Sequence, residues 1–326
     1  MSRAEQIGEE IIRMIESGNS VDSVKVSLGL STDEWYRFAS KAYNVYLNRD
    51  KKKRKEDEFK AHTLCTTNEQ IDEILDLNNT LADYALLMPI LSTMGDFMQL
   101  KILIGTLPSS ESRIIELIGK ITMHPKIRVM QKKGRFEKLE HFKIFTKLID
   151  AATLSYYRTN FISCYLTLLP IVEGTIIRWM GYSETETKPE FEEIRKFFKN
   201  SFLRQPCPRN VLFFNIYIKA CDKILNEHFY KPTSNGNSYA NFNRHVASHI
   251  LNDNQFATKE NCIRLFVLID IMTEIYLYET KSIDHRFNLT NEEMADEIEL
   301  LATTMIGNCK KSPEHELLGT SINDLM

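Results

Sequence analysis

Apolar residues along this chain recur mostly at three- and four-residue spacing, which predicts helices rather than strands. Residues 4–17 carry apolar side chains on one face, and Gly18 follows at a position typical of a helix end. Residues 159–181 and 258–281 are apolar nearly all round, which indicates helices in the middle of a bundle. We therefore predict an all-α fold. Further helices are expected at 32–47, 97–106, 110–123, 137–158, 190–202, 209–229 and 238–251.

Three polar patterns predict where helices begin. Ser31–Glu34, Thr67–Gln70 and Thr290–Glu293 each place a hydroxyl residue three positions before Glu or Gln, the spacing of a capping box. The second pattern starts a long amphipathic helix that Pro89 is expected to end or kink.

The segment Val21–Tyr46 has helix-turn-helix spacing: a short helix, a turn with Gly29, and a capped helix. One interpretation is that this module contacts DNA or RNA. The other is that its apolar residues only pack the core of a small helical module. The pattern leaves both open, and the residues concerned are Trp35, Phe38, Ala42 and Val45.

Two basic runs lie in the first half of the chain. In Arg49–Lys55 six basic residues precede three acids, which favours a solvated helix extension or linker over a phosphate-binding segment. We place a first domain boundary there. The second run, Lys120–Arg135, contains no acid, and its Pro125 and Gly134 favour a loop or short hairpin. It is the better candidate for contacts with a nucleic-acid backbone, through Lys126, Arg128, Lys132, Lys133 and Arg135.

These patterns divide the chain into four predicted ranges. They are a helix-turn-helix-like module at 1–55, a middle helical layer with a basic loop at 56–135, a helical bundle at 136–285, and a C-terminal helix with a loosely held tail at 286–326.

Composition narrows the class of protein. A net charge of −3 excludes a polycation, so nucleic-acid contacts must come from local patches. The N-terminus does not resemble a signal peptide, and no long uncharged apolar stretch predicts a membrane span. The six cysteines include no Cys-x-x-Cys pair and read as small buried hydrophobes, which favours a reducing, cytoplasmic location.

The candidate chemistry lies in Asn241–Leu251, which combines Arg244, His245 and His249 with two asparagines and a serine. A loop precedes it, and Asn237 or Ser238 can cap the helix expected there. The apolar residues at four-residue spacing, Phe242, Val246 and Ile250, predict its buried stripe.

Arg244 and His249, in the pattern Arg-x4-His on a helix of a bundle, resemble the signature of the HEPN superfamily. His245 matches the polar residue that often follows that arginine, and Glu173 resembles acids in those bundles. The resemblance covers about residues 136–285. It implies an RNA-cleaving or RNA-binding helical domain that is dimeric and metal-independent, with no cofactor. The resemblance also implies a toxin or antiphage-defence role, including abortive infection, and a protein regulator.

The chemistry of RNA cleavage without metal suits these residue types. A histidine can take the proton from the ribose 2′-OH or give one to the leaving 5′-oxygen. An arginine can stabilise the charge that gathers on the phosphate. On one ideal helix Arg244 and His249 point about 140° apart (five steps of about 100°). A dimer in which each helix lends a side chain to its partner therefore makes a tighter site.

Other interpretations stay open. His249 can be a core histidine, with Arg244 pairing with Glu173 or Asp270 because buried carboxylates need partners. His245 and His249, one turn apart, can share a metal, although no third ligand has suitable spacing. As an alternative function, the chain is a non-catalytic nucleic-acid-binding or dimeric scaffold protein that uses its N-terminal module.

Overall fold

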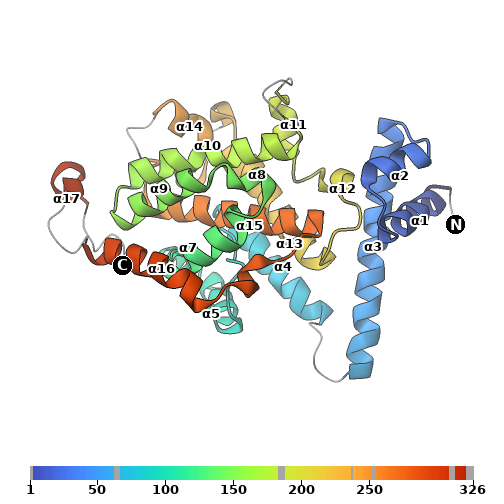
Figure 1. Cartoon of the computed structure of the whole chain (residues 1–326), viewed down its shortest axis with the longest axis horizontal. Coiled ribbons are helices and arrows are strands. Elements are labelled where there is room, and N and C mark those ends of the chain that lie inside the picture. Colours follow the sequence, from blue (N-terminus) through green and yellow to red (C-terminus); the bar gives the residue numbers. More distant parts are fainter. Residues whose placement is uncertain are drawn as a thin grey trace. The chain divides into compact units, whose positions relative to one another are not determined.

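Helices form all the regular structure in the part of the chain that the computed structural model describes, which confirms the all-α prediction (Figure 1). The described residues are 3–61, 67–182, 188–235, 238–251, 255–307 and 313–320. Contacts divide the chain into two compact units. Unit 1 comprises 1–79, 196–222 and 274–283, and unit 2 comprises 80–195, 223–273 and 284–326. Both units combine segments that are distant in the sequence, whereas the four predicted ranges are contiguous.

Unit 1 is organised around the packing of α1 on α3. Ile11, Ile12 and Ile15 of α1 bury against Trp35 and other apolar residues of α3. The Trp35 indole also donates a hydrogen bond to the Leu203 carbonyl at 3.0 Å. The unit contains α1 (Arg3–Glu16), α2 (Val21–Ser27), α3 (Thr32–Ala61), α12 (Ser201–Arg204) and parts of α4 (Asn68–Asp83), α13 (Val211–Ile224) and α15 (Lys259–Thr280).

The helix-turn-helix spacing has a structural counterpart, because α2 and α3 are joined by a turn in which Gly29 adopts φ +60°. Trp35, Phe38 and Ala42 are buried in the core of unit 1, and Val45 packs against it. These residues therefore pack the module, as the second interpretation expects. Contact of the module with nucleic acid stays a prediction.

The first basic run does not form a boundary between domains. Helix α3 continues through Arg49–Lys55 to Ala61, so the expected break near residue 55 is absent. Charges pair along and beside this helix: Arg54 with Asp50 at 3.0 Å, and Arg49 with Glu9 of α1. The run is thus the charge-paired helix extension that its neighbouring acids favour.

Unit 2 surrounds helix α10 (Phe161–Trp179), which packs along α9 (Thr146–Tyr157) (Figure 1). Helix α10 is long and apolar enough to cross a membrane, yet most of it is buried within the protein. Among the residues that the structure describes, it is the one helix that meets these criteria, and such burial is also found in the core helices of soluble proteins. The other elements are α5 (Met94–Ile104), α6 (Glu111–Thr122), α7 (Pro125–Gln131), the π-helical turn η1 (Lys132–Phe136), α8 (Glu140–Lys143), α11 (Phe191–Arg195), η2 (Leu225–Phe229), η3 (Thr233–Asn235), η4 (Tyr239–Asn241), α14 (Arg244–Ser248), η5 (His285–Asn288), α16 (Asn291–Gly307) and α17 (Pro313–Leu318).

The predicted core helices and capping boxes are confirmed. Helices α10 and α15 begin and end within two residues of the expected ranges. Reciprocal hydrogen bonds join Thr67 with Gln70 and Thr290 with Glu293, and Ser31 with Glu34 likewise. Cys164, Cys207, Cys221 and Cys262 are buried free thiols, whereas Cys65 and Cys309 lie outside the described residues.

The predicted tail is partly helical. Within 310–326, residues Pro313–Leu318 form α17, and the hydroxyls of Thr320 and Thr159 lie 2.9 Å apart. Residues 310–312 and 321–326 of the predicted tail lie outside the described ranges.

Helix α15 is buried at every position from Asn261 to Leu277, so its charged residues need partners inside the protein. Arg264 donates to the Tyr84 carbonyl at 3.0 Å and pairs with Glu111 at 3.3 Å. Asp270 is bound by Arg128, a residue of the second basic run. That run forms α7 and η1 rather than the predicted loop or hairpin, because its arginines reach carboxylates in the core.

The Arg128–Asp270 pair yields a test of this arrangement. Replacing Arg128 by Met leaves a buried carboxylate without its cation, which should lower the free energy of unfolding by about 3–5 kcal/mol. Replacing both, as Arg128→Met with Asp270→Leu, should restore most of that loss because no charge stays unpaired. Denaturant titration followed by circular dichroism measures both variants. The exposed Arg158→Met is the control, and a single Arg128 variant as stable as this control would contradict the pairing.

Candidate active site around Arg244 and His249

The residues singled out by the Arg-x4-His pattern lie on a helix much shorter than predicted. Helix α14 covers only Arg244–Ser248, and His249 follows directly as its C-terminal cap. Before it the chain turns at Ala240 and Asn241, both in the left-handed region with φ of 51° and 58°. A continuous helix over 238–251 is therefore wrong, because the backbone reverses between Ser238 and Asn243.

Asn243 determines where the helix begins. Its side-chain oxygen accepts from the backbone N–H of His245 at 2.8 Å and of Val246 at 3.1 Å. It is thus the N-cap, whereas Ser238 makes no side-chain cap and Asn237 lies outside the described residues. The Asn243 amide also donates to the carbonyls of Lys231, at 2.7 Å, and His228, at 3.2 Å. One buried side chain therefore ties α14 to the end of η2 and the residues after it.

A second asparagine holds the turn that precedes α14. Asn261, at the buried start of α15, donates to the carbonyls of Ala240 at 2.8 Å and Phe256 at 2.9 Å. Its side-chain oxygen accepts from Arg264 at 3.0 Å. The left-handed backbone at Ala240 is thus held against α15. This contact fixes the position of the turn from which α14 and Arg244 follow.

Arg244 forms an ion pair with Glu173 of α10, with Nε and Oε2 separated by 2.7 Å. The other oxygen of Glu173 accepts from Lys188 at 2.8 Å. Glu173 is 8% exposed, whereas the Arg244 side chain keeps 36% of its surface exposed. The structure therefore brings together Arg244 and Glu173, and it assigns Asp270 to Arg128 instead.

Tyr230 belongs to the same cluster, although no sequence pattern points to it. Its hydroxyl is buried and has no hydrogen-bond partner among the described residues. Burial raises the pKa of Tyr230, and the negative charge of Glu173 raises it further, so the hydroxyl stays protonated. An uncharged donor thus lies within the electrostatic reach of Glu173 and Arg244. Lys188 is a second residue that the sequence analysis did not identify.

His245 and His249 lie together on the exposed side of α14. Their ring centroids are 4.6 Å apart, with an angle of 64° between the planes. Both are exposed, so His249 is not the core histidine of the structural alternative. In the described ranges no group of three or more His, Cys, Asp or Glu side chains could hold a metal, so the two imidazoles have no third ligand of that kind beside them.

The predicted buried stripe of this segment is only partly present. Phe242 is fully buried and Val246 half-buried, but Ile250 is 57% exposed. The helix ends at Ser248, and Ile250 adopts φ +50°, which turns it away from the face that Ala247 buries. Ile250 and Leu251, also 57% exposed, thus form an apolar edge directly after His249.

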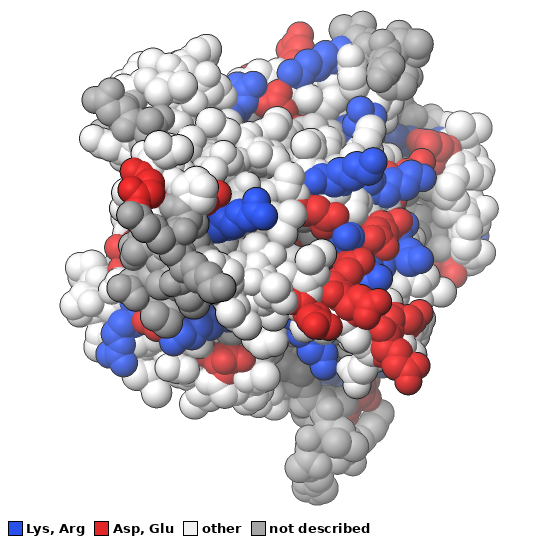
Figure 2. All heavy atoms as spheres, turned by 60° about the vertical axis from the view of Figure 1, so that its left-hand side comes forward, with Lys and Arg blue, Asp and Glu red and all other residues white. Residues whose placement is uncertain are grey.

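Most of the basic residues proposed for RNA contact form ion pairs with acidic residues of the protein itself. Arg128 and Arg135 are 4% and 0% exposed, so their predicted phosphate contacts are wrong: they bind Asp270 and Asp284 inside the protein. Lys132 pairs with Asp150 at 2.9 Å, and both Lys132 and Lys133 pair with Glu297. Figure 2 shows basic side chains lying among acidic ones on one face of the molecule. Lys126 is exposed, and its contact with nucleic acid stays a prediction.

Comparisons of the chain with models of known protein families, with curated proteins and with solved structures gave no match. The description of this site therefore depends on its own residues.

His228, whose carbonyl accepts a hydrogen bond from the N-cap Asn243 of α14, gives a prediction for the pH dependence of stability. Its Nε2 lies 2.9 Å from the Ala82 carbonyl and must carry a proton, while Nδ1 is buried without a partner among the described residues. Burial lowers the pKa of His228 below its ordinary value of about 6.5. The unfolded chain then binds the proton more readily, so this stabilisation is present above about pH 6.5 and is lost as pH falls through the lowered pKa.

The variant His228→Gln keeps a donor for the Ala82 carbonyl. When the pH is lowered from about 7.5 to 5.5, we expect its melting temperature to fall less than that of the parent. Thermal melts at the two pH values measure the difference, and other titrating groups cancel because both proteins share them. The half-buried His285→Gln serves as the control. Parallel pH dependence in the parent and the His228 variant would contradict the assignment.

Proposed function

We propose that this chain is a metal-independent endoribonuclease of HEPN type that cleaves RNA by attack of a ribose 2′-OH on the neighbouring phosphate. The observation that supports it is the juxtaposition on α14: Arg244 held by a buried carboxylate, followed by two exposed imidazoles in contact. An arginine and a histidine are the groups that this chemistry needs. A cytoplasmic toxin or antiphage-defence effector, controlled by a protein regulator, is the biological role in this proposal.

Each side chain has a role in the proposed reaction. His249, exposed at the end of α14, takes the proton from the 2′-OH or delivers one to the leaving 5′-oxygen. Arg244 stabilises the negative charge that develops on the phosphate. Glu173 orients Arg244 through Nε while the side chain stays one-third exposed, so the guanidinium can meet a substrate phosphate. His245 contacts the His249 ring and keeps it in place.

The proposal includes a homodimer, or a higher oligomer, formed through α14. On an ideal helix Arg244 and His249 would point about 140° apart (five steps of about 100°), and α14 ends before His249. The proposal therefore has a second protomer complete the site across a phosphate. The exposed apolar residues Ile250 and Leu251 directly follow His249. Burying them against a second copy would bring the histidines of one protomer towards Arg244 of the other.

A non-catalytic scaffold is the second candidate, and the same ion pair favours it. An arginine that only ties α14 to Glu173 of α10 needs no substrate, and exposed apolar residues after it would serve dimerisation alone. The nucleic-acid contacts would then come from the helix-turn-helix-like module. Catalytic activity separates the two candidates.

Purified protein should degrade RNA in the presence of EDTA and leave ends with a 2′,3′-cyclic phosphate, because the attacking group is the substrate's own 2′-OH. His249→Ala should lower the rate about 10²–10⁴-fold, and Arg244→Ala about 10²–10³-fold. Gel analysis of a labelled RNA measures both. The exposed Arg158 and the half-buried His285 offer matched alanine controls, which should cleave like the parent.

Circular-dichroism melts of the same proteins complete this test. His249→Ala should melt close to the parent because His249 is exposed. Arg244→Ala should do so as well because Lys188 still pairs with the buried Glu173. No RNA cleavage by the parent, or cleavage that survives in both variants, would refute the nuclease and leave the scaffold.

Sedimentation at micromolar concentration should show more than one protomer. Leu251→Asp should shift the protein towards the monomer, because a charge would be desolvated in the apolar contact. Leu317→Asp, at an 82% exposed leucine of α17, is the matched control and should sediment like the parent. A strictly monomeric parent with full nuclease activity would contradict a site shared between two protomers.

A further inference from the structure

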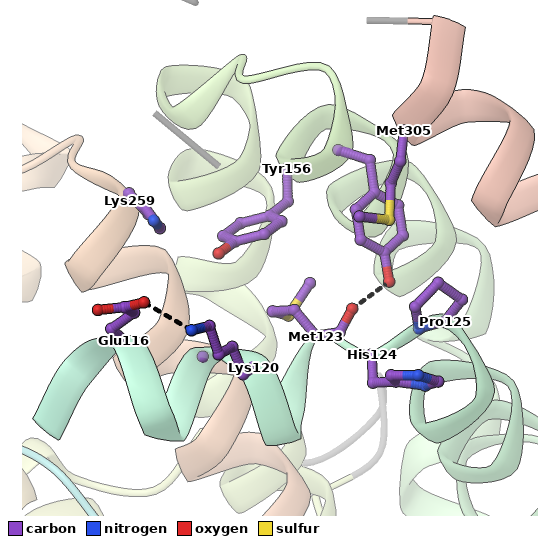
Figure 3. A pocket seen from close by; sticks show the side chains of 10 residues that line it. Glu116, Lys120, Met123, His124, Pro125, Tyr156, Lys259 and Met305 are labelled. Atoms are coloured by element: carbon purple, nitrogen blue, oxygen red, sulfur yellow. Dashed lines mark hydrogen bonds and ion pairs between the residues drawn. The ribbon is translucent and has the colours of Figure 1, made fainter. Parts of the chain in front are cut away.

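A cavity of about 250 Å³ lies in unit 2, apart from the residues of the candidate active site. It opens where α6 ends and the chain turns through His124 and Pro125 into α7 (Figure 3). Helix α9 supplies Tyr156, the start of α15 supplies Lys259, and α16 supplies Met305. Five helices, α6, α7, α9, α15 and α16, thus contribute to its lining.

The floor of the cavity is built from flat and polarizable side chains. Tyr156 and Met123 are 3% and 5% exposed, and Met305 of α16 also lines the cavity (Figure 3). Aromatic rings and thioether sulfurs pack favourably on the faces and edges of other aromatic rings. An apolar cavity of about 150 Å³ is known to hold benzene. This one therefore has room for a single aromatic ring together with a substituent.

Positive charge is concentrated at the opening. Lys120 pairs with Glu116 at 2.6 Å, whereas Lys259 has no ion-pair partner among the described residues. The hydrogen bond from Lys120 lowers the pKa of Glu116, and the nearby charge of Lys259 lowers it further, so the carboxylate stays ionised. Two ammonium groups against one carboxylate leave a net positive charge at the edge of an apolar floor.

A neutral donor accompanies these charges. In Figure 3 the Tyr156 hydroxyl points into the opening, towards Lys259 and the Glu116–Lys120 pair. Burial raises the pKa of Tyr156 well above its ordinary value, so the hydroxyl keeps its proton. By contrast, Tyr157 already donates its proton to the Met123 carbonyl at 2.6 Å. Tyr156 is thus the tyrosine available to an incoming acceptor.

We propose that this cavity binds a small aromatic anion, with its ring against Tyr156, Met123 and Met305 and its carboxylate or phosphate between Lys259 and the Tyr156 hydroxyl. The shape fits one ring, and the charge selects an acid over a neutral compound of the same size. The site does not include Arg244 or His249, so this proposal is tested independently of the proposed nuclease activity.

Isothermal titration with phenyl phosphate, phenylacetate and benzyl alcohol tests the proposal and distinguishes the two kinds of anion. At least one of the two anions should bind the full chain with one-to-one stoichiometry, and benzyl alcohol at least about tenfold more weakly. Lys259→Met should weaken anion binding about tenfold, the effect of losing about 1.4 kcal/mol. Tyr156→Phe keeps the ring and should weaken the anion while leaving benzyl alcohol unchanged.

Lys147→Met is the matched control, an exposed lysine at the other end of α9, and should bind like the parent. Circular dichroism confirms that each variant is folded before titration. No saturable binding of either anion up to about 10 mM, beyond the millimolar range of weak ligands, overturns the proposal. Equal binding of benzyl alcohol and the anions, or unchanged affinity in folded Lys259→Met, overturns it as well.

Discussion

The burial of α15 from Asn261 to Leu277 is the constraint on which the rest of unit 2 depends. A charged side chain inside a protein must be matched by an opposite charge or by hydrogen bonds, and α15 carries both an arginine and an aspartate in its buried middle. Arg264 therefore requires Glu111 at the start of α6, and Asp270 requires Arg128 of α7. Apolar contacts alone would allow these helices to slide, whereas each ion pair fits only one register.

The candidate active site depends on the same helix through a side-chain amide. Asn261 holds the turn at Ala240, and Asn243 satisfies two amides of α14 and two carbonyls near η2. A helix of five residues has little stability of its own, because nucleating a single turn is unfavourable in water. The position of Arg244 is thus determined by two buried asparagines rather than by the helix that carries it.

Sequence patterns predicted what is local or repeated many times. Helices α10 and α15 were predictable because apolar residues surround them, and the capping boxes because donor and acceptor lie three residues apart. The pairing of Arg244 with Glu173 was among the alternatives considered, because a buried carboxylate restricts the choice of partner.

Long-range partners escaped sequence analysis. Arg128 and Asp270 are 142 residues apart, and Arg135 and Asp284 are 149 apart, so an acid-free run looked like a free basic surface. The short length of α14 was missed for the same reason, since Asn243 bonds to carbonyls 12 and 15 residues earlier. Tyr230 gave no pattern at all, because only the fold brings it near Glu173.

The contact between η1 and η5 fastens the C-terminal part of unit 2 to a segment far earlier in the chain. Asp284 accepts hydrogen bonds from Arg135 and Arg286, and Gly134 leaves no room for a Cβ beside the Arg286 backbone. This contact joins the chain leading into α16 to a segment about 150 residues earlier. The chain that enters α16, the helix of Met305, is thereby anchored, and α16 itself packs against α7 and α9. A molecule bound in this cavity would contact side chains that only the folded chain brings together, and it would therefore stabilise the folded chain relative to the unfolded one.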